Sequence, residues 1–287
     1  MVVWSQKPQR PVLGTLSQGT IFSCARAEDY PACAVRGLTI TARCDVAHEK
    51  TRIFSYLPVV SLRDWWHMDG LSLLLDRAQR EQMSSLRDTL KTAGHSDSIL
   101  SVHSPRLVVD TLFPETNVGA QAKVRTRALA IVDAIEEIGS CQLPATTDRL
   151  AKLCSTFSKL RRVLMDELLK GKLAGFYFLP MVEFDGPDDG FVVLLREVRH
   201  LPRSVARAVG AGLVKPLDES GLAALTPHLS FAGDDFAMPI GQLPSPLTEH
   251  VMQSFTILFS RIGLEDLPTV YLSEVWERLD IEKKAKS

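Results

Sequence analysis

The stretch GFYFLPMVEFDGPDDGFVVLLREV, residues 175–198, decides the fold class, because it restarts a β pattern after a long helical middle. Two apolar runs, 175–184 and 190–198, flank the segment Asp-Gly-Pro-Asp-Asp at 185–189. Aromatic and β-branched residues favour strands, and Gly, Pro and Asp together favour a turn. The stretch therefore predicts a β-hairpin.

A second β region precedes the helical middle. Strands are predicted at Thr20–Phe22, Leu38–Thr41 and Arg52–Val60, where β-branched and aromatic residues concentrate. Short connections separate them at Asp29-Tyr30-Pro31 and His48-Glu49-Lys50. The chain thus places β structure on both sides of one helical segment.

Residues 61–174 follow a helical period instead. Leu71, Leu75, Ala78, Leu86 and Leu90 predict one helix that Gly94 ends, and prolines at 105 and 114 predict short helices and loop after it. The segments 124–138 and 147–170 each carry an apolar stripe that a glycine follows. The pattern predicts a helical bundle.

Helical signals return near the end of the sequence. A short helix is predicted over 218–225, a longer one from Ser245 to Gly263 with Pro246 as its first residue, and a last one over 269–279. The expected fold is α+β. Its parts are a β domain of residues 11–60 and 175–243, a helical insertion of residues 61–174, and C-terminal helices of residues 244–281 that pack on the core.

Composition is that of an ordinary globular protein, with 287 residues, 45% hydrophobic and 23% charged. The net charge of -1 argues against wholesale wrapping of nucleic acid but allows a local basic patch. Apolar runs fall short of the ~18–20 residues that span a bilayer, and MVVWSQKPQR lacks the core of a secretion signal. Five cysteines, an odd number, indicate reduced thiols. We expect a cytoplasmic protein without membrane contact.

Two blocks carry a family resemblance: QGTIFSCARAEDYPACAVRGLTITARCD at 18–45 and DGFVVLLREVRHLPRSVARAVGAGLVKPLDESGLAAL at 189–225. The first resembles the opening of the MazF/PemK toxin family, through Gly19-Thr20-Ile21, Arg36-Gly37 and the apolar run 38–42. The second resembles the closing strand of that family, at 191–201, and its short following helices. The resemblance implies a discontinuous SH3-like β-barrel, spread over about 18–60 and 175–225, that carries a helical insertion.

Toxins of this family cleave RNA with an Arg at the start of the second strand and a Thr at the end of the third. Arg36 stands at the Arg position, which makes it a candidate catalytic residue. The Thr position falls on Pro58-Val59-Val60, where this chain has no hydroxyl. The resemblance therefore implies a non-catalytic binding or regulatory component of a bacterial toxin–antitoxin or phage-defence system. A MazF-like endoribonuclease is the alternative.

A cluster of reactive types offers a further alternative. Cys44, Asp45 and His48 supply, within five positions, the residue types that thiol catalysis needs: a nucleophile, a base that activates it and a group that orients the base. Cys24 and Cys33 together with Cys44 and His48 match the ligand types of a zinc site. The cysteines are, however, much farther apart in sequence than the closely spaced pairs that usually bind zinc. A half-buried cysteine at a strand end and scattered core cysteines explain both patterns, so we expect no metal and no cofactor.

Two surfaces are candidates for binding. Positive charge gathers at Arg196, Arg199, His200, Arg203 and Arg207, which favours RNA or DNA contact or, alternatively, a charge-protected edge strand. Trp65 and Trp66 open the helical insertion and indicate either core packing or a contact with a protein partner. Sequence motifs of the common nucleotide-binding, metalloprotease and hydrolase families do not occur in the chain.

Overall fold

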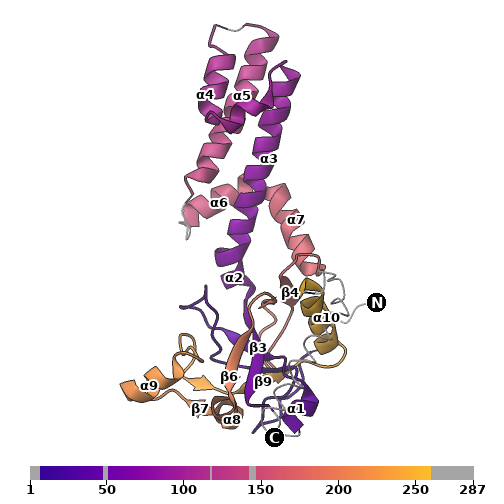
Figure 1. The fold of residues 1–287 in the computed structure, drawn as a ribbon, viewed down its shortest axis with the longest axis vertical. Coiled ribbons are helices and arrows are strands. Elements are labelled where there is room, and N and C mark those ends of the chain that lie inside the picture. The colour runs from indigo at the N-terminus through magenta and orange to yellow at the C-terminus, as the bar shows by residue number, and fades with distance from the viewer. Residues whose placement is uncertain (1–6, 48–50, 117, 142–146, 260–287) are drawn as a thin grey trace, which may run out of the picture.

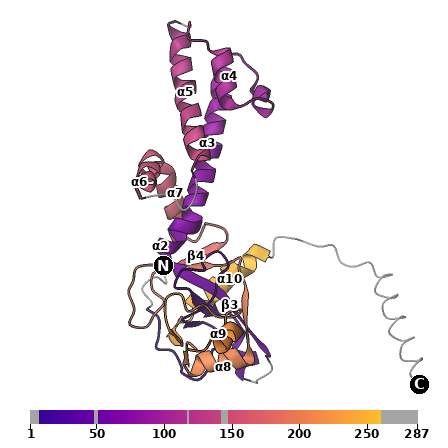
Figure 2. The same ribbon diagram turned by 90° about the vertical axis from the view of Figure 1, so that its left-hand side faces the viewer.

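The computed structural model describes residues 7–47, 51–116, 118–141 and 147–259. It has a mixed α+β architecture, in which a long helical arm rises from a base built on a curled sheet (Figures 1 and 2). The sheet is antiparallel throughout, and its strands come from both sides of the helical segment. The predicted α+β class is confirmed, and so is the prediction that the two β regions share one sheet.

The sheet of the described residues has seven strands. Six follow the order β4-β5-β3-β2-β1-β9, and β6 pairs with β3 beside β5. The strands are β1 Thr20–Phe22, β2 Arg36–Thr39, β3 Ile53–Ser61, β4 Phe176–Leu179, β5 Phe191–Leu194, β6 Arg199–Pro202 and β9 Pro239–Gln242. The long strand β3 joins the two β regions, because its end pairs with β5 and its beginning pairs with β6.

The predicted hairpin is confirmed, although its strands are shorter than expected. Phe176 lies opposite Leu194 and Leu179 lies opposite Phe191, and the loop of residues 180–190 joins them. The expected continuous closing strand over 191–201 is wrong. The chain turns after β5, where the Glu197 amide donates to the Leu194 carbonyl at 3.3 Å, and β6 begins afterwards.

The sheet is curled but does not close into a barrel. Among the described strands, no ladder joins β4 to β9 at the two ends of the sheet. Only the loop after β4 reaches across, where the Phe184 amide donates to the Ile240 carbonyl at 3.1 Å. The expectation of a barrel is therefore wrong as to closure. The strand β4 ends at Leu179, before the chain that follows it runs alongside β9.

Eight helical segments of the described chain form the arm. They are α2 Leu62–Trp65, the π-helical turn η2 Trp66–Gly70, α3 Leu71–Thr92, η3 Asp97–Ser101, α4 Pro105–Leu112, α5 Ala120–Gly139, α6 Thr147–Thr156 and α7 Ser158–Leu169. Ser61 begins α2, because its hydroxyl accepts the Asp64 amide as an N-cap. The segment 147–170, expected to form one helix, is instead divided into α6 and α7 at Phe157, whose φ of -103° and ψ of 35° are not helical.

The outer part of the arm has a hydrophobic core of its own. The α3 and α5 helices lie side by side along most of its length, and α4 covers their outer half (Figure 2). The buried residues there form a cluster separate from those of the base: Leu86, Leu90, Val108, Val109, Phe113, Ala128, Ile131, Val132 and Ile135. The outer part of the arm therefore has its own hydrophobic core, which is a requirement for a unit that packs independently.

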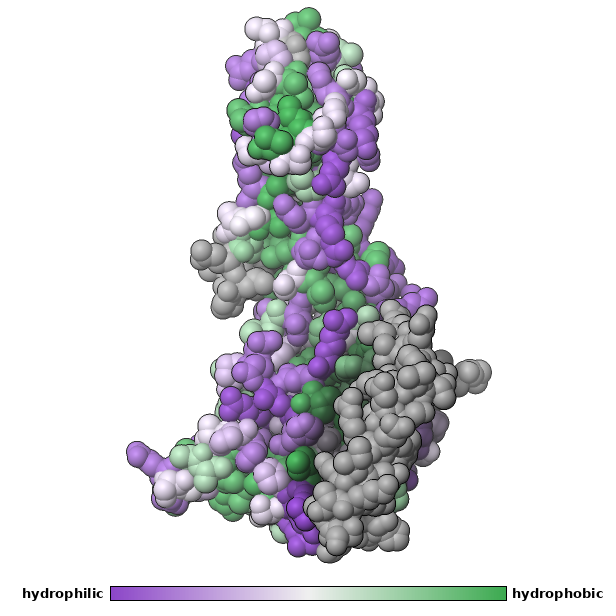
Figure 3. Space-filling model, in the orientation of Figure 1, coloured by the Kyte–Doolittle hydropathy of each residue, from purple (hydrophilic) through white to green (hydrophobic). Residues whose placement is uncertain are grey.

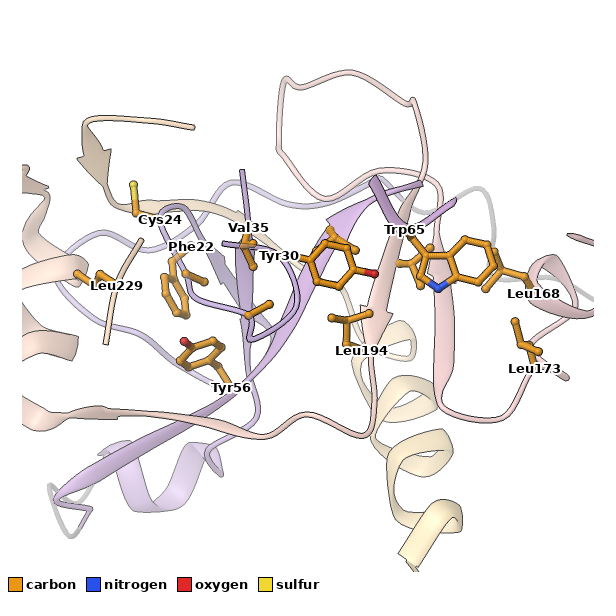
Figure 4. Packing of buried hydrophobic residues seen from close by; sticks show 14 of the residues in the cluster. Phe22, Cys24, Tyr30, Val35, Tyr56, Trp65, Leu168, Leu173, Leu194 and Leu229 are labelled. Atoms are coloured by element: carbon orange, nitrogen blue, oxygen red, sulfur yellow. The ribbon is translucent and has the colours of Figure 1, made fainter. Parts of the chain in front are cut away.

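The base has a core on each face of the sheet, and the alternation along β3 explains why. Tyr56 and Val60 belong to one cluster, whereas Leu57 and Val59 belong to the other. The first cluster runs from Phe22 and Tyr56 toward the foot of the arm at Trp65 (Figure 4). The second packs against the helix α10, Leu247–Phe259.

The remaining elements surround the base. They are α1 Arg43–Ala47, α8 Arg203–Ala211, the small ribbon of β7 Leu213–Val214 with β8 Phe236–Ala237, and α9 Glu219–Leu225. The predicted helix after Pro246 is α10, but its predicted end at Gly263 and the predicted helix over 269–279 lie outside the described residues. Each described helix is too short or too polar to cross a lipid bilayer.

Candidate functional site

Arg36, the residue that the family resemblance singles out, is held by contacts on three sides. It begins β2, and its Nε and Nη2 donate to Oε1 of Glu183 at 3.0 and 2.6 Å. Its Nη1 donates to the Ala34 carbonyl at 3.1 Å, and its guanidinium lies 5.0 Å from the ring centre of Phe191. Glu183 thus neutralises the charge that a phosphate would need.

The position across from Arg36 is apolar. The strand register places Val59 opposite Arg36 and Pro58 opposite Gly37. Val59 and Val60 are fully buried. General acid–base chemistry needs a proton-carrying group within hydrogen-bond reach of the reacting atoms. The strand that faces Arg36 supplies no such group at this register.

A small pocket of about 100 Å³ lies beside Arg36, and Cys24 is part of its wall. Cys24 adopts a left-handed backbone conformation with φ 58°, and its thiol donates to the Asp234 carbonyl at 3.3 Å. Burial, with help from the nearby Asp234 carboxylate, raises the pKa of the Cys24 thiol to about 11. Because a thiolate is the nucleophilic form, the burial of this thiol disfavours a role as a nucleophile.

The cysteine-centred cluster does not assemble around Arg36. Cys44 and Asp45 lie on α1 rather than at a strand end, both are exposed, and the Cys44 thiol contacts Asp45 Oδ1 at 3.7 Å. The α1 helix follows the end of β2, whereas Arg36 begins that strand. His48 lies outside the described residues.

The cysteines of the zinc hypothesis are also apart. Cys44 lies on α1, whereas Cys24 and Cys33 lie near the beginning and the end of the loop between β1 and β2, and Cys24 lines the pocket beside Arg36. Burial and the neighbouring Asp64 carboxylate raise the pKa of the Cys33 thiol. Within the described part of the chain, no three His, Cys, Asp or Glu side chains lie where they could hold one metal ion.

The basic residues after β5 divide between different surroundings. Arg199 bonds to Glu197 at 2.6 Å and to Glu28, and His200, its neighbour on β6, contacts the Ser55 hydroxyl at 3.1 Å. Successive residues of a strand point to opposite faces, so these two side chains do not act together. Arg196 is exposed and lies against Gly175.

Arg203 and Arg207 are the two basic residues that the fold brings together. They are one helical turn apart on α8 and line a cavity of about 230 Å³ with Thr51 and Phe54. Arg203 Nε donates to the Thr51 carbonyl at 3.0 Å. The predicted basic cluster therefore reduces to this pair.

The two tryptophans at the foot of the arm differ in exposure. Trp65 is fully buried and packs edge-on against Phe176, with 5.4 Å between ring centres, so it serves the core rather than a partner. Trp66 is half-buried. Next to them, the Tyr30 hydroxyl donates to Asp69 Oδ2 of the π-helical turn, which ties the β1–β2 loop to the arm.

The most informative partners, Glu183 and Asp69, were not among the predicted site residues. Glu183 is 147 positions away from Arg36, and Asp69 is 39 positions away from Tyr30. Charge along the sequence gives no signal for pairs at such separations. Comparison of the chain with protein-family models, curated proteins and solved structures finds no significant match.

Proposed function

We propose that this protein is a non-catalytic binding component, whose helical arm docks a protein partner. The observation that carries the proposal is the separate hydrophobic core of the arm, which lets α3, α4 and α5 hold their shape away from the base. The inner half of the arm shares a core with the sheet through residues such as Leu74, Ala78 and Leu164, whereas the outer half packs only on itself. Its surface is available to another macromolecule.

The outer half of the arm also exposes apolar side chains. Val102 is 77% exposed, Leu107 on α4 is 53% exposed and Val118 is 83% exposed. Hydrophobic residues gather around α4 between hydrophilic stripes (Figure 3). Apolar side chains near the centre of an interface supply much of the binding energy, whereas a polar rim adds specificity. The arm combines both features.

The ribonuclease alternative receives less support. Arg36 is paired with Glu183, and Val59 stands opposite it. We infer from the family resemblance an SH3-like ancestry of the curled sheet and a cytoplasmic role in a bacterial toxin–antitoxin or phage-defence system. The absence of a hydroxyl opposite Arg36 and the pairing of Arg36 with Glu183 would leave a fold that binds a partner without cleaving RNA.

The test uses a tagged full-length chain, cross-linked in its native host, and compares wild type with a Val102→Asp/Leu107→Asp variant. Both positions are exposed, so the charges leave the arm core intact. We expect a stoichiometric protein partner with wild type and its loss with the double variant. Val12→Asp, at a base residue that is 69% exposed, is the matched control and retains the partner.

A parallel assay addresses cleavage. Wild type and Arg36→Ala are incubated with single-stranded RNA, and neither is expected to cut it. Cleavage by wild type that disappears in Arg36→Ala would establish a ribonuclease and defeat the proposal. If the Val102→Asp/Leu107→Asp variant kept the partner, the arm would not be part of the interface.

A further inference from the structure

A groove on the base, away from the arm, has the features of a second binding site. It lies between α9 and the β1–β2 loop and has a volume of about 400 Å³. Apolar side chains form much of its wall: Ala27, Pro31, Leu222, Leu229 and Phe231. A shallower hollow beside Ala223 and Pro227 shares Arg26 and Thr226 with it, so the concave surface continues along α9.

The α9 helix covers this groove without filling it. None of its residues is fully buried, and Leu222 and Leu225 are half-buried. The helix projects from the base beside the small β7–β8 ribbon (Figure 1). Leu217, immediately before it, is entirely exposed. Apolar surface on both the helix and the groove is therefore available for contact.

Three cationic side chains line the concave surface, and two of them are neutralised. Lys215 is paired with Asp235 at 2.9 Å, and Arg199 is paired with Glu197 and with Glu28. Arg26 is different. Its Nη1 donates to the Thr226 carbonyl at 2.7 Å, and among the described residues no carboxylate lies within ion-pair distance of it.

This arrangement favours one class of occupant. A guanidinium that a carbonyl fixes in place, with donors to spare, suits a carboxylate. The apolar walls suit aliphatic or aromatic side chains on either side of that carboxylate. Nucleic acid needs several uncompensated cations along a backbone, whereas this groove has one. We propose that the groove beneath α9 binds an acidic peptide motif, a carboxylate flanked by apolar side chains, from a partner protein.

The proposal does not depend on the arm, and its test can fail separately. Phage-displayed random short peptides are selected on the full-length wild-type chain, and the enriched peptides are synthesised. We expect an Asp or Glu beside apolar residues in the enriched set. Arg26→Gln removes the charge but keeps a donor for the Thr226 carbonyl, and we expect it to weaken binding at least about tenfold.

Two comparisons locate the contact. An Asp→Asn or Glu→Gln change in the peptide should cost the same factor with wild type and nothing further with Arg26→Gln. Leu222→Asp on the groove wall should also weaken binding, which keeps the test valid if Arg26→Gln folds poorly. Arg63→Gln is the matched control, because Arg63 is an exposed arginine at the foot of the arm, and it should bind as wild type does.

Three results would overturn the proposal. The first is an enriched set without acidic residues, and the second is equal binding by wild type, Arg26→Gln and Leu222→Asp. The third is displacement of the peptides by single-stranded RNA whose own binding is lost in Arg26→Gln, which would make the groove a nucleic-acid site.

Discussion

The guanidinium of Arg36 and the carboxylate of Glu183 form an ion pair, with 2.6 Å between Nη2 and Oε1, across 147 residues of sequence. The pair connects the start of β2 with the loop after β4, close to where the two ends of the sheet approach each other. Both side chains are about three-quarters buried. The pair therefore contributes to the curl of the sheet as well as neutralising Arg36.

Glu183→Gln should destabilise the protein by about 1–2 kcal/mol, because it leaves a largely buried guanidinium without its counter-charge. Urea unfolding followed by circular dichroism measures the change. The double variant with Arg36→Gln should lose less than the sum of the two single variants. Additive losses would show that the contact contributes nothing. Glu183→Gln should also leave RNA uncut, because Val59 remains opposite Arg36.

The bond between Tyr30 and Asp69 gives a pH-dependent prediction. Burial raises the pKa of Asp69 above its ordinary value of 3.8, with contributions from Asp29 and Glu197, and the Tyr30 hydrogen bond opposes that rise. The folded state thus holds this proton more tightly than the unfolded state does. The contribution of Asp69 to stability consequently falls as pH rises from about 4 through the raised pKa.

Tyr30→Phe removes the donor to Asp69 and leaves the charged carboxylate without it. We expect a loss of about 1.5–3 kcal/mol at neutral pH, and a smaller loss near pH 4, where Asp69 is protonated. Thermal or urea unfolding across this range measures both values. Asp69→Asn is the control, and its own stability should vary less with pH than that of wild type. A loss in Tyr30→Phe that does not change with pH would contradict the assignment.

Trp65 tests whether the foot of the arm is a packing site. It is fully buried against Phe176 of β4, and Leu168 and Leu173 lie beside it (Figure 4). Trp65→Ala should cost about 3–5 kcal/mol through the cavity it leaves. Its indole Nε1 has no partner within the described residues, so Trp65→Phe should cost much less. Trp66→Ala, at a half-buried side chain, is the comparison, and an equal cost at both positions would contradict this account.

Thiol labelling separates the cysteines by environment. Cys44 is exposed, whereas Cys24 is buried and has its pKa raised to about 11. Iodoacetamide at about pH 8 should modify Cys44 first and leave Cys24 unmodified until the protein unfolds. Mass spectrometry of the peptides measures the order. Cys44→Ser should remove the fast phase, and rapid modification of Cys24 in the folded protein would contradict the prediction.

Local patterns predicted most of the secondary structure. The run of β-branched and aromatic residues in β3 and the apolar stripe of α3 both mark buried positions, and both elements form where expected. The sequence gives no sign of the break at Phe157, because its buried side chain fits the apolar stripe whether the helix is continuous or bends there. Periodicity reports which face is buried, not whether the backbone is continuous.

The site was less predictable, because its properties depend on contacts between distant residues. Arg36 begins β2, yet its positive charge is countered by Glu183 from the other β region. The basic run from Arg196 to Arg207 looks continuous in sequence, but the turn after β5 and the alternation of β6 separate its members. Clustering along a chain becomes clustering in space only within one helix face, as for Arg203 and Arg207.

The outer half of the arm should unfold separately from the base, because its core shares no buried residue with the two core clusters of the base. Leu90 lies fully buried in the arm core on α3, and Leu57 lies fully buried in the sheet on β3. Leu90→Ala should cost about 2–5 kcal/mol of local stability. Hydrogen exchange read by mass spectrometry should then show faster exchange in α4 and α5, while β2 and β3 keep the protection of wild type.

Leu57→Ala is the matched variant, since it removes the same atoms from an equally buried position. It should accelerate exchange in the strands and leave the outer arm as protected as in wild type. If Leu90→Ala accelerated exchange equally in the arm and in the strands, the two parts would unfold as one unit. In that case the arm would depend on the base for its shape, and the proposal that it docks a partner as an independently packed projection would lose its support.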